Sequence, residues 1–270
     1  MITQGKKKLF LIDSYALIYR AYFAFIKNPR INSKGFDTSA IYGFLNTLTE
    51  LIREEKPTHI ATVFDLKGPT KRHELYTEYK ANRDAMPEGI SLAIPYIKSL
   101  IDSLNIQQIS LAGYEADDLI GTLSKKAEKE GFTTYMITPD KDFAQLVSDN
   151  IFIYKPGTRG DGPTIMGKKD VCEKYGLQNI NQFIDFLAMM GDSSDNIPGI
   201  AGVGPKTAQR LIEEYGSMIG VYDNIENISG KLKEKLIDSK ENAFLSKKLV
   251  KIIIDAPLES SISDLLRKKP

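Results

Sequence analysis

Short apolar segments alternate with longer helical patterns over the first two-thirds of the sequence. Five segments are rich in apolar and β-branched residues and are bounded by turn formers: KLFLID (8–13), HIATVFD (59–65), IQQISLA (106–112), TTYMITPD (133–140) and IFIYKP (151–156). Three stretches between them have apolar residues at three- and four-residue spacing: 41–56, 90–105 and 117–131. Strands alternating with crossover helices predict an α/β fold with a largely parallel central sheet flanked by helices.

The strand pattern ends near residue 168, and helical patterns follow it. They occupy residues 168–177, 179–191, 205–216 and 241–253. We therefore expect two domains, an α/β core at residues 6–167 and a helical region at residues 168–262. The closing segment SSISDLLRKKP is polar and gives no signal for how the chain ends.

Composition excludes several classes of protein. The single cysteine, Cys172, cannot form an internal disulfide, and no apolar run approaches the length of a membrane span. Only two histidines, His59 and His73, are present, so a histidine-rich zinc site cannot be built. We expect a cytoplasmic protein without a membrane partner.

Acidic residues end or closely follow four of the predicted strands. They are Asp13, Asp65, Glu115, Asp117, Asp118, Asp140 and Asp142. The carboxyl ends of parallel strands share one edge of an open sheet, where ligands bind, so these acids should meet there. The motif GDSSDN in the helical region adds Asp192 and Asp195.

Each acid alone has an ordinary structural explanation, such as a helix cap or a residue of a first helical turn. A helix dipole contributes about 1 kcal/mol, however, which cannot offset repulsion among so many anions. Hard cations such as Mg²⁺ or Mn²⁺ bind carboxylate oxygens and need neither histidine nor cysteine. The excess of acids over one octahedral site predicts two ions, about 4 Å apart as in two-metal phosphoryl chemistry.

The segment 66–90 combines basic and aromatic residues directly after Asp65. Its basic residues include Lys71, Arg72, Lys80 and Arg83, and Tyr76 and Tyr79 lie among them. Such a segment predicts contacts with phosphates and stacking on bases. An exposed amphipathic excursion without a ligand is the alternative.

A glycine-rich turn precedes the helical pattern at 205–216. Gly199, Gly202 and Gly204 are followed by Pro205, which suits the first position of a helix. Glycines before a helix leave backbone N–H groups free to hold a phosphate. The pattern indicates a helix–hairpin–helix element that binds duplex backbone.

Together these motifs resemble the 5′→3′ exonuclease (flap endonuclease) domain at the N-terminus of bacterial DNA polymerase I. The resemblance covers about residues 8–258 and is carried by IYRAY, VFD, YKANR, EADD, TPDKD, MGDSSDNIPG and GVGPKTA. It implies a PIN-like, resolvase-like nuclease core with a helical arch at about residues 66–90. It also implies a C-terminal helix–hairpin–helix (H3TH) element.

The resemblance assigns roles to the acids and to several other residues. The first ion would be held by Asp13, Asp65, Glu115 and Asp117, and the second by Asp140, Asp142, Asp192 and Asp195, with Asp118 nearby. Catalytic basic residues would be Lys80 and Arg83 of the arch together with Arg20. DNA would be contacted by Tyr19, by Arg72 and by the hairpin residues Gly199, Gly202, Gly204, Lys206 and Thr207, with K⁺ as a further ion at the hairpin.

The expected function is that of a structure-specific 5′ nuclease that uses two metal ions. It would cut DNA at 5′ ends and 5′-flap junctions, leave 5′-phosphate and 3′-hydroxyl ends, and serve primer removal and repair. Its partners would be 5′ flaps, nicked or gapped duplexes and RNA primers on DNA. We expect a monomer, with fusion to a polymerase domain left open. The alternatives are a metal-dependent phosphatase, a related RNA-cutting nuclease and a non-catalytic DNA-binding module.

Overall fold

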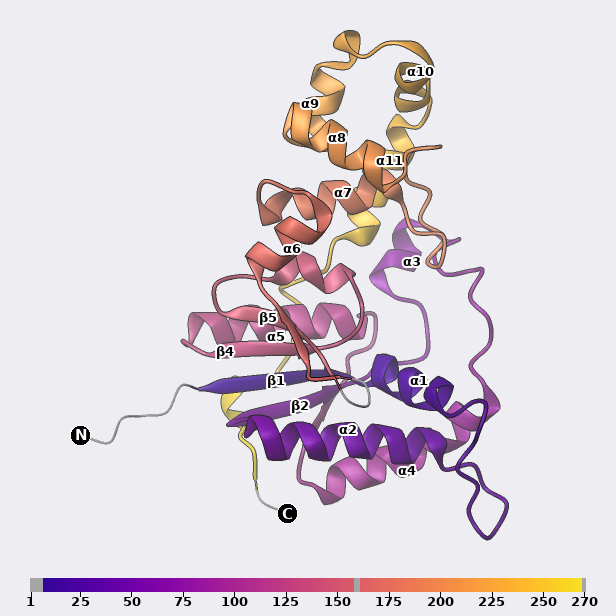
Figure 1. The fold of residues 1–270 in the computed structure, drawn as a ribbon, viewed down its shortest axis with the longest axis vertical. Coiled ribbons are helices and arrows are strands. Elements are labelled where there is room, and N and C mark those ends of the chain that lie inside the picture. Colours follow the sequence, from indigo (N-terminus) through magenta and orange to yellow (C-terminus); the bar gives the residue numbers. More distant parts are fainter. Residues whose placement is uncertain (1–6, 158–160, 269–270) are drawn as a thin grey trace, which may run out of the picture.

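The computed structural model describes residues 7–157 and 161–268 (Figure 1). Its centre is a sheet of six strands in the order β3-β2-β1-β4-β5-β6. Their bounds are β1 Lys8–Asp13, β2 His59–Val63, β3 Gln107–Ile109, β4 Thr133–Ile137, β5 Ile151–Lys155 and β6 Thr164–Met166. The first five strands are parallel and β6 is antiparallel to β5, which confirms the predicted largely parallel sheet.

Strand β1 lies at the centre, where the direction of winding changes. It pairs with β2 on one side and with β4 on the other, so that Ile12 lies between Thr62 and Ile137. The chain first builds one half of the sheet through β2 and β3 and then returns to build the other. Crevices at such a switch point are where open α/β sheets bind their ligands.

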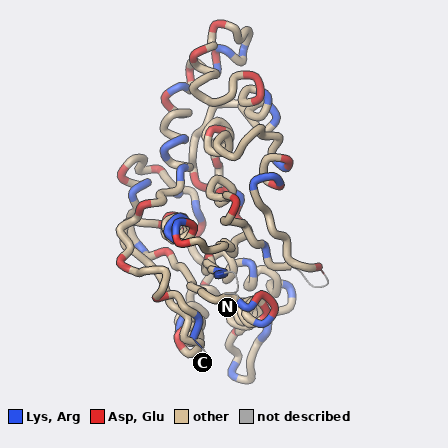
Figure 2. The backbone as a smooth tube through the Cα atoms, turned by 90° about the vertical axis from the view of Figure 1, so that its left-hand side faces the viewer, with Lys and Arg blue, Asp and Glu red and all other residues tan. Residues whose placement is uncertain are grey.

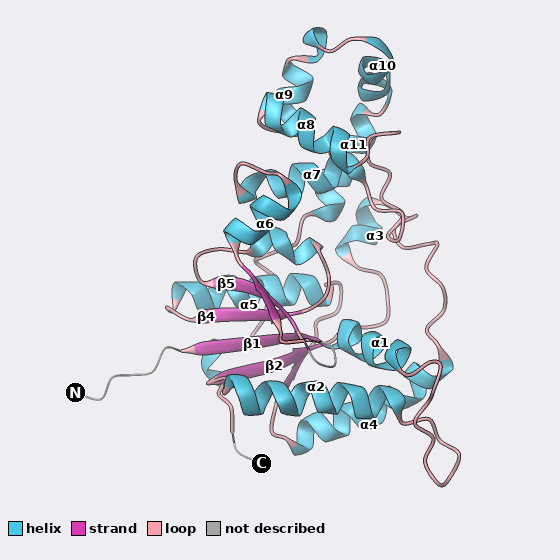
Figure 3. Ribbon diagram, viewed as in Figure 1, coloured by secondary structure: helices cyan, strands magenta, loops and turns pink. Residues whose placement is uncertain are grey.

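Helices cover both faces of the sheet (Figure 3). Helices α1 (Ser14–Ala24), α2 (Ser39–Glu55) and α4 (Glu88–Ser103) pack in one layer, and α5 (Ala116–Lys129) lies on the opposite face. Alternate side chains of β1 serve the two layers, because Phe10 and Ile12 belong to one buried cluster and Leu9 and Leu11 to the other. No helix in the described residues has both the length and the apolar character needed to span a bilayer.

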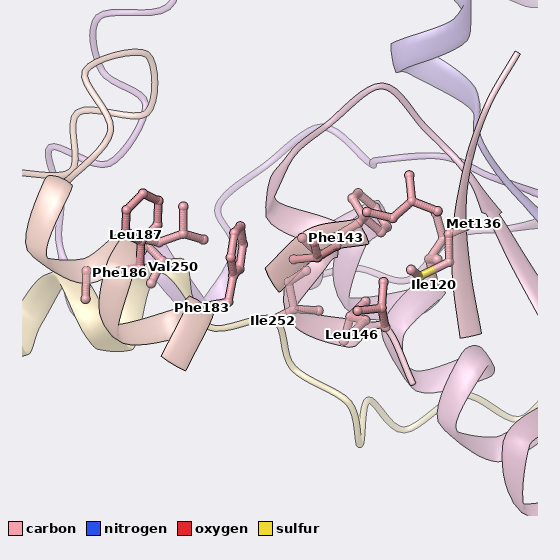
Figure 4. Packing of buried hydrophobic residues seen from close by; sticks show 14 of the residues in the cluster. Ile120, Met136, Phe143, Leu146, Phe183, Phe186, Leu187, Val250 and Ile252 are labelled. Atoms are coloured by element: carbon pink, nitrogen blue, oxygen red, sulfur yellow. The ribbon is translucent and has the colours of Figure 1, made fainter. Parts of the chain in front are cut away.

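The second part of the chain is helical, as expected. It contains α6 (Lys168–Tyr175), α7 (Phe183–Met190), α8 (Pro205–Tyr215), α9 (Met218–Asp223), α10 (Gly230–Asp238) and α11 (Lys240–Val250). Figure 4 shows how its core joins that of the sheet region, with Phe143 and Leu146 beside Ile252, followed by Phe183. One buried cluster therefore fixes the helical region relative to the carboxyl edge of the sheet.

Two elements differ from the sequence-based expectation. The strand expected at 106–112 is paired only over β3, the short strand at the edge of the sheet. The terminal segment does close the fold: Ile262 and Leu265 of the 3-10 helix η4 (Ile262–Leu265) are each 1% exposed. The Arg267 N–H then donates a 2.9 Å hydrogen bond to the Thr58 carbonyl before β2. Three apolar residues in an otherwise polar segment were too little signal to predict this return.

The segment between β2 and α4 passes along one side of the molecule, near the carboxyl ends of the strands (Figure 1). Within the expected arch at 66–90, helix occurs only at α3 (Lys71–Leu75) and from the start of α4. The remainder consists of turns and irregular backbone, including three successive turn bonds at Tyr79, Ala81 and Arg83. We refer to residues 76–87 as the arch segment.

Candidate metal centre

Acidic side chains from separate strands meet at the carboxyl edge of the sheet, as predicted. Asp13 is the last residue of β1, where its Oδ1 accepts from the Ala16 N–H at 3.2 Å and its Oδ2 from the Thr138 hydroxyl at 2.8 Å. Asp65 follows β2 and accepts from the Ala116 N–H at 2.7 Å. Each carboxylate is therefore oriented by a neighbouring strand end or helix start.

These acids line a cleft of about 770 Å³. The acidic residues on its wall are Asp13, Asp65, Asp84, Glu115, Asp117, Asp140, Asp142 and Asp195. Aromatic and apolar residues line the same cleft, among them Tyr15, Tyr19, Phe23 and Met86. One cleft thus offers carboxylates for cations and flat surfaces for rings.

Several of these carboxylates lack enough positive charge around them. Burial, with repulsion from Asp65 and Asp140, raises the pKa of Asp13 to about 7. Burial and the neighbouring Asp140 raise the pKa of Asp142 to about 7, and burial with Asp140 and Asp13 raises that of Asp117. An added cation would favour the ionised form of each group.

The donor set fits a hard divalent cation. All of the cleft-lining acids offer carboxylate oxygen, which Mg²⁺ and Mn²⁺ prefer. Within the described residues, Oδ1 of Asp142 is buried and accepts no hydrogen bond, while the ammonium of Lys141 lies 3.7 Å from it. A buried oxygen without a donor is costly, and a bound cation would relieve that cost.

Basic side chains of the protein occupy other carboxylates of the cluster. Lys80 contacts Glu115 at 2.9 Å, and Lys141 contacts Asp192 at 2.6 Å. Burial alone would raise the pKa of each of these acids, but the ammonium groups lower both below the usual range. In this conformation no three His, Cys, Asp or Glu side chains of the described residues are gathered closely enough to hold an ion. Loading of the site would therefore require the acids to exchange these contacts for metal contacts.

Asp118 and Arg72 correct two of the predictions. Asp118 is fully buried, and both of its oxygens accept from the Arg72 guanidinium at 2.9 Å. Its oxygens also accept from the N–H groups of Glu115 and Ile253. Asp118 therefore has no oxygen left for a metal, and its role is to hold the start of α5.

Arg72 is only 4% exposed, so its predicted contact with DNA backbone is wrong as well. Besides Asp118, its guanidinium donates to the carbonyls of Leu249 and Lys251, at 2.8 and 3.1 Å. The residue thus ties α3 to α5 and to the end of α11. It also lies 3.4 Å from Glu115, which makes it part of the support of the cluster.

Three further residues differ from their predicted positions. Arg20 does not line the cleft, and it donates to the Gly157 carbonyl at 2.6 Å. Tyr79 is 3% exposed, so it cannot stack on a base; its hydroxyl donates to Glu115 at 3.1 Å and to Asp195 at 3.3 Å. Gly199 is buried and its N–H donates to Ser246, so it is unavailable to a phosphate.

The two other glycines of the turn are accessible. Gly202 and Gly204 are exposed, Gly202 has the positive φ of 73° that favours glycine, and Gly204 caps α8. Lys206 is exposed in the first turn of the same helix. Figure 2 shows that lysine and arginine positions occur from this helical region to the sheet, mixed with acidic ones.

Lys141 is the residue that sequence reasoning missed most clearly. It contacts Asp192 and lies near Asp142, although the two acids are fifty positions apart. Its place inside the motif TPDKD was the available signal. Thr138, which donates to Asp13, offered no comparable sign.

Comparison with known families agrees with this geometry. Residues 8–176 match the family described as 5′-3′ exonuclease, N-terminal resolvase-like domain, and residues 178–270 match its C-terminal SAM fold. This division falls after α6, whereas the predicted one falls before it. The chain is 39% identical to a 5′-3′ exonuclease of Aquifex aeolicus, over 98% of its own length and 88% of that protein. It therefore belongs to the 5′-3′ exonuclease family.

Other relatives are named DNA polymerase I. Identity is 43% to the Bacillus subtilis protein and 40% to that of Caldicellulosiruptor bescii, over 96% and 97% of this chain. The chain spans only 29% and 31% of the length of these curated relatives.

Solved structures show the same fold. A T5 5′-exonuclease with bound divalent metal ions (zinc) superposes with a TM-score of 0.73 at 24% identity, over 91% of this chain and 90% of that one. The catalytic core of Rad2 in complex with DNA substrate gives 0.58 at 19% identity, over 93% and 80%.

Asp142→Asn should stabilise the protein when divalent ions are removed. The raised pKa means that the folded state retains a proton that the unfolded state has lost, so the free energy of unfolding falls as pH rises from about 4 to about 7. The uncharged amide of the Asp142→Asn variant removes this loss of stability. In EDTA at pH 8 the Tm of the variant should therefore be a few degrees above that of the wild-type protein. Thermal unfolding between pH 5 and 8 measures it, with Asp223→Asn on the surface as control. Equal pH slopes for variant and wild type would contradict the assignment.

Arg72→Met should lower the free energy of unfolding by about 3–5 kcal/mol, because it leaves Asp118 charged, buried and unpaired. Lys71→Met, at the exposed neighbouring position, is the matched control and should change it by less than about 1 kcal/mol. Urea unfolding measures both. A normally stable Arg72→Met protein with weakened DNA binding would restore the DNA-contact assignment.

Proposed function

We propose that this chain is a structure-specific 5′ nuclease that hydrolyses DNA phosphodiesters at 5′ ends and at 5′-flap junctions. The products would carry 5′-phosphate and 3′-hydroxyl ends. The observation that carries the proposal is the gathering of strand-end carboxylates beside the basic arch segment, in a member of the 5′-3′ exonuclease family. The Rad2 core with its DNA substrate supports DNA as the ligand of this cleft.

Two Mg²⁺ or Mn²⁺ ions, when bound, would supply the positive charge that stabilises the attacking and leaving oxygens. Asp13, Asp65, Glu115 and Asp117 would hold the first ion, and Asp140, Asp142, Asp192 and Asp195 the second. The raised pKa values of Asp13, Asp117 and Asp142 and the undonated oxygen of Asp142 support cation binding at these acids.

Lys80 and Arg83 would bind the phosphate that is cut. Lys80 already lies in the cleft, and the guanidinium of Arg83, whose side chain is 54% exposed, contacts Asp195. When the acids bind cations, these two donors become available to phosphate oxygens, and a guanidinium can bind two of them at once. Both therefore position the phosphate and balance its charge.

Tyr19 would stack on the base next to the cleavage point, because it lies on the cleft wall with Phe23, 6.3 Å away between ring centres. The turn at Gly202 and Gly204, with Lys206 and Thr207, would bind the downstream duplex through its backbone. A K⁺ ion held by carbonyls of this turn would complete that contact.

The setting of the activity is also a proposal. The relatives named DNA polymerase I support a role in primer removal and repair beside a polymerase domain, acting on flaps, nicked or gapped duplexes and RNA primers. The chain would act as a monomer in the cytoplasm.

A DNA flap labelled at its 5′ end tests the proposal. We expect cleavage near the junction in Mg²⁺ or Mn²⁺, none in EDTA, and a loss of roughly 10²- to 10³-fold or more in Asp117→Asn. An all-RNA flap and a simple phosphomonoester serve as comparison substrates. Cleavage of the RNA flap while the DNA flap stays uncut would favour the RNA-cutting nuclease. Hydrolysis of the phosphomonoester while the DNA flap stays uncut would favour the phosphatase. Binding of DNA without any cleavage would favour the non-catalytic module.

A further inference from the structure

The base of the arch segment is tied to the loop that carries Asp192 and Asp195. The Lys80 N–H donates to the Asp195 carbonyl at 2.9 Å. Two side-chain amides join the same two segments, one donated from each side. Asn82 donates to the Ser193 carbonyl and Asn196 donates to the Glu78 carbonyl, each at 2.7 Å. These segments lie more than a hundred positions apart in the sequence.

Both sides of this contact hold unusual backbone. Lys80 has a φ of 58° and Asn196 a φ of 56°, in the left-handed region that residues other than glycine seldom adopt. Neighbouring side chains of an extended segment point to opposite sides. With the turn at Lys80, however, the Tyr79 hydroxyl and the Lys80 ammonium both reach Oε2 of Glu115, at 3.1 and 2.9 Å. Such strain persists only where the surroundings hold it in place.

The charged contacts of the arch segment cannot supply that hold during a reaction. Lys80 and Arg83 pair with Glu115 and Asp195, which are the carboxylates that cations would take. The Arg83 side chain is also 54% exposed, and ion pairs of exposed side chains are weak, at about 0–1 kcal/mol. The bonds from Asn82 and Asn196 involve neutral amides and main-chain carbonyls. They do not compete with a cation or with a phosphate.

We propose that Asn82 and Asn196 form a clasp that sets the position of Lys80 and Arg83 over the carboxylate cluster. The clasp consists of the two amide bonds to Ser193 and Glu78. Asn82 and Asn196 are thus positioning residues, since they act through Lys80 and Arg83. The effect on turnover rests on the proposed nuclease function, whereas the clasp itself does not.

Hydrogen exchange of residues 76–86, followed by mass spectrometry in EDTA, tests the clasp without any substrate. Asn82→Ala and Asn196→Gly remove the donors, and glycine keeps the left-handed backbone at 196. Each should speed exchange in this segment by roughly tenfold or more, because the turn that holds the amides of Lys80 and Arg83 loses one of its side-chain ties to the Asp195 loop and opens more often. Asn82→Gln keeps an amide and should restore much of the protection. Asn227→Ala, at an exposed asparagine in the helical region, is the control.

Steady-state cleavage of the 5′-flap substrate then separates positioning from a merely structural tie. We expect kcat to fall roughly 10- to 100-fold in Asn82→Ala and Asn196→Gly, with KM changed less than about threefold, since misplacement of catalytic groups affects the reacting geometry most. Asn82→Gln should recover most of kcat. Thermal unfolding should show all variants folded.

Two results would overturn the inference. Exchange at 76–86 that equals wild type in both donor-removing variants would show that the clasp does not hold the arch segment. Faster exchange with unchanged kcat would show that the clasp does not position the catalytic groups. If the wild-type protein cut no DNA at all, the proposed function would fail, and the exchange experiment would still decide whether the clasp exists.

Discussion

Repulsion among carboxylates at the carboxyl edge of the sheet is the interaction on which the rest of the site depends. Strand ends and the start of α5 bring Asp13, Asp117, Asp140 and Asp142 together, and burial raises the cost of their charge. Hydrogen bonds from Thr138 and from main-chain N–H groups meet only part of that cost. A fold stabilised solely for its own sake would not gather these groups. Their arrangement makes sense as a receptor for positive charge that is completed when Glu115 and Asp192 exchange their lysine contacts for bound cations.

The surrounding chain holds these carboxylates in place, while the lysine and arginine side chains that contact them can be replaced. Below the cluster, the buried pair of Arg72 and Asp118 binds α3, α5 and the end of α11 into one support. Above it, Lys80 and Arg83 contact acids from the arch segment, and Lys141 contacts Asp192 from the sheet edge. The lower contact is fully desolvated and permanent in character. The upper contacts are partly exposed, so metal ions and phosphates can replace them.

Much of the fold and of the acidic set could be predicted, because strand and helix periods place the acids at strand ends without any tertiary information. The features that could not be predicted depend on the direction in which a side chain points and on partners that are distant in the sequence. Asp117 and Asp118 are adjacent in one motif, yet successive residues of a helix point about 100° apart. Asp117 therefore lines the cleft, whereas Asp118 turns into the interior. Gly199 likewise meets the backbone of Gly191, and Arg20 meets Gly157, through packing that no local pattern records.

Direct counting of bound Mn²⁺ tests the central claim that these carboxylates are gathered to hold divalent ions. Electron paramagnetic resonance at pH 7.5, with free and bound Mn²⁺ separated during a titration, gives both stoichiometry and affinity without DNA. We expect two ions per chain in the wild-type protein, with affinity weakened roughly tenfold or more by Asp13→Asn and unaltered by Asp223→Asn. Absence of bound Mn²⁺, or binding that Asp13→Asn leaves unchanged, would contradict it.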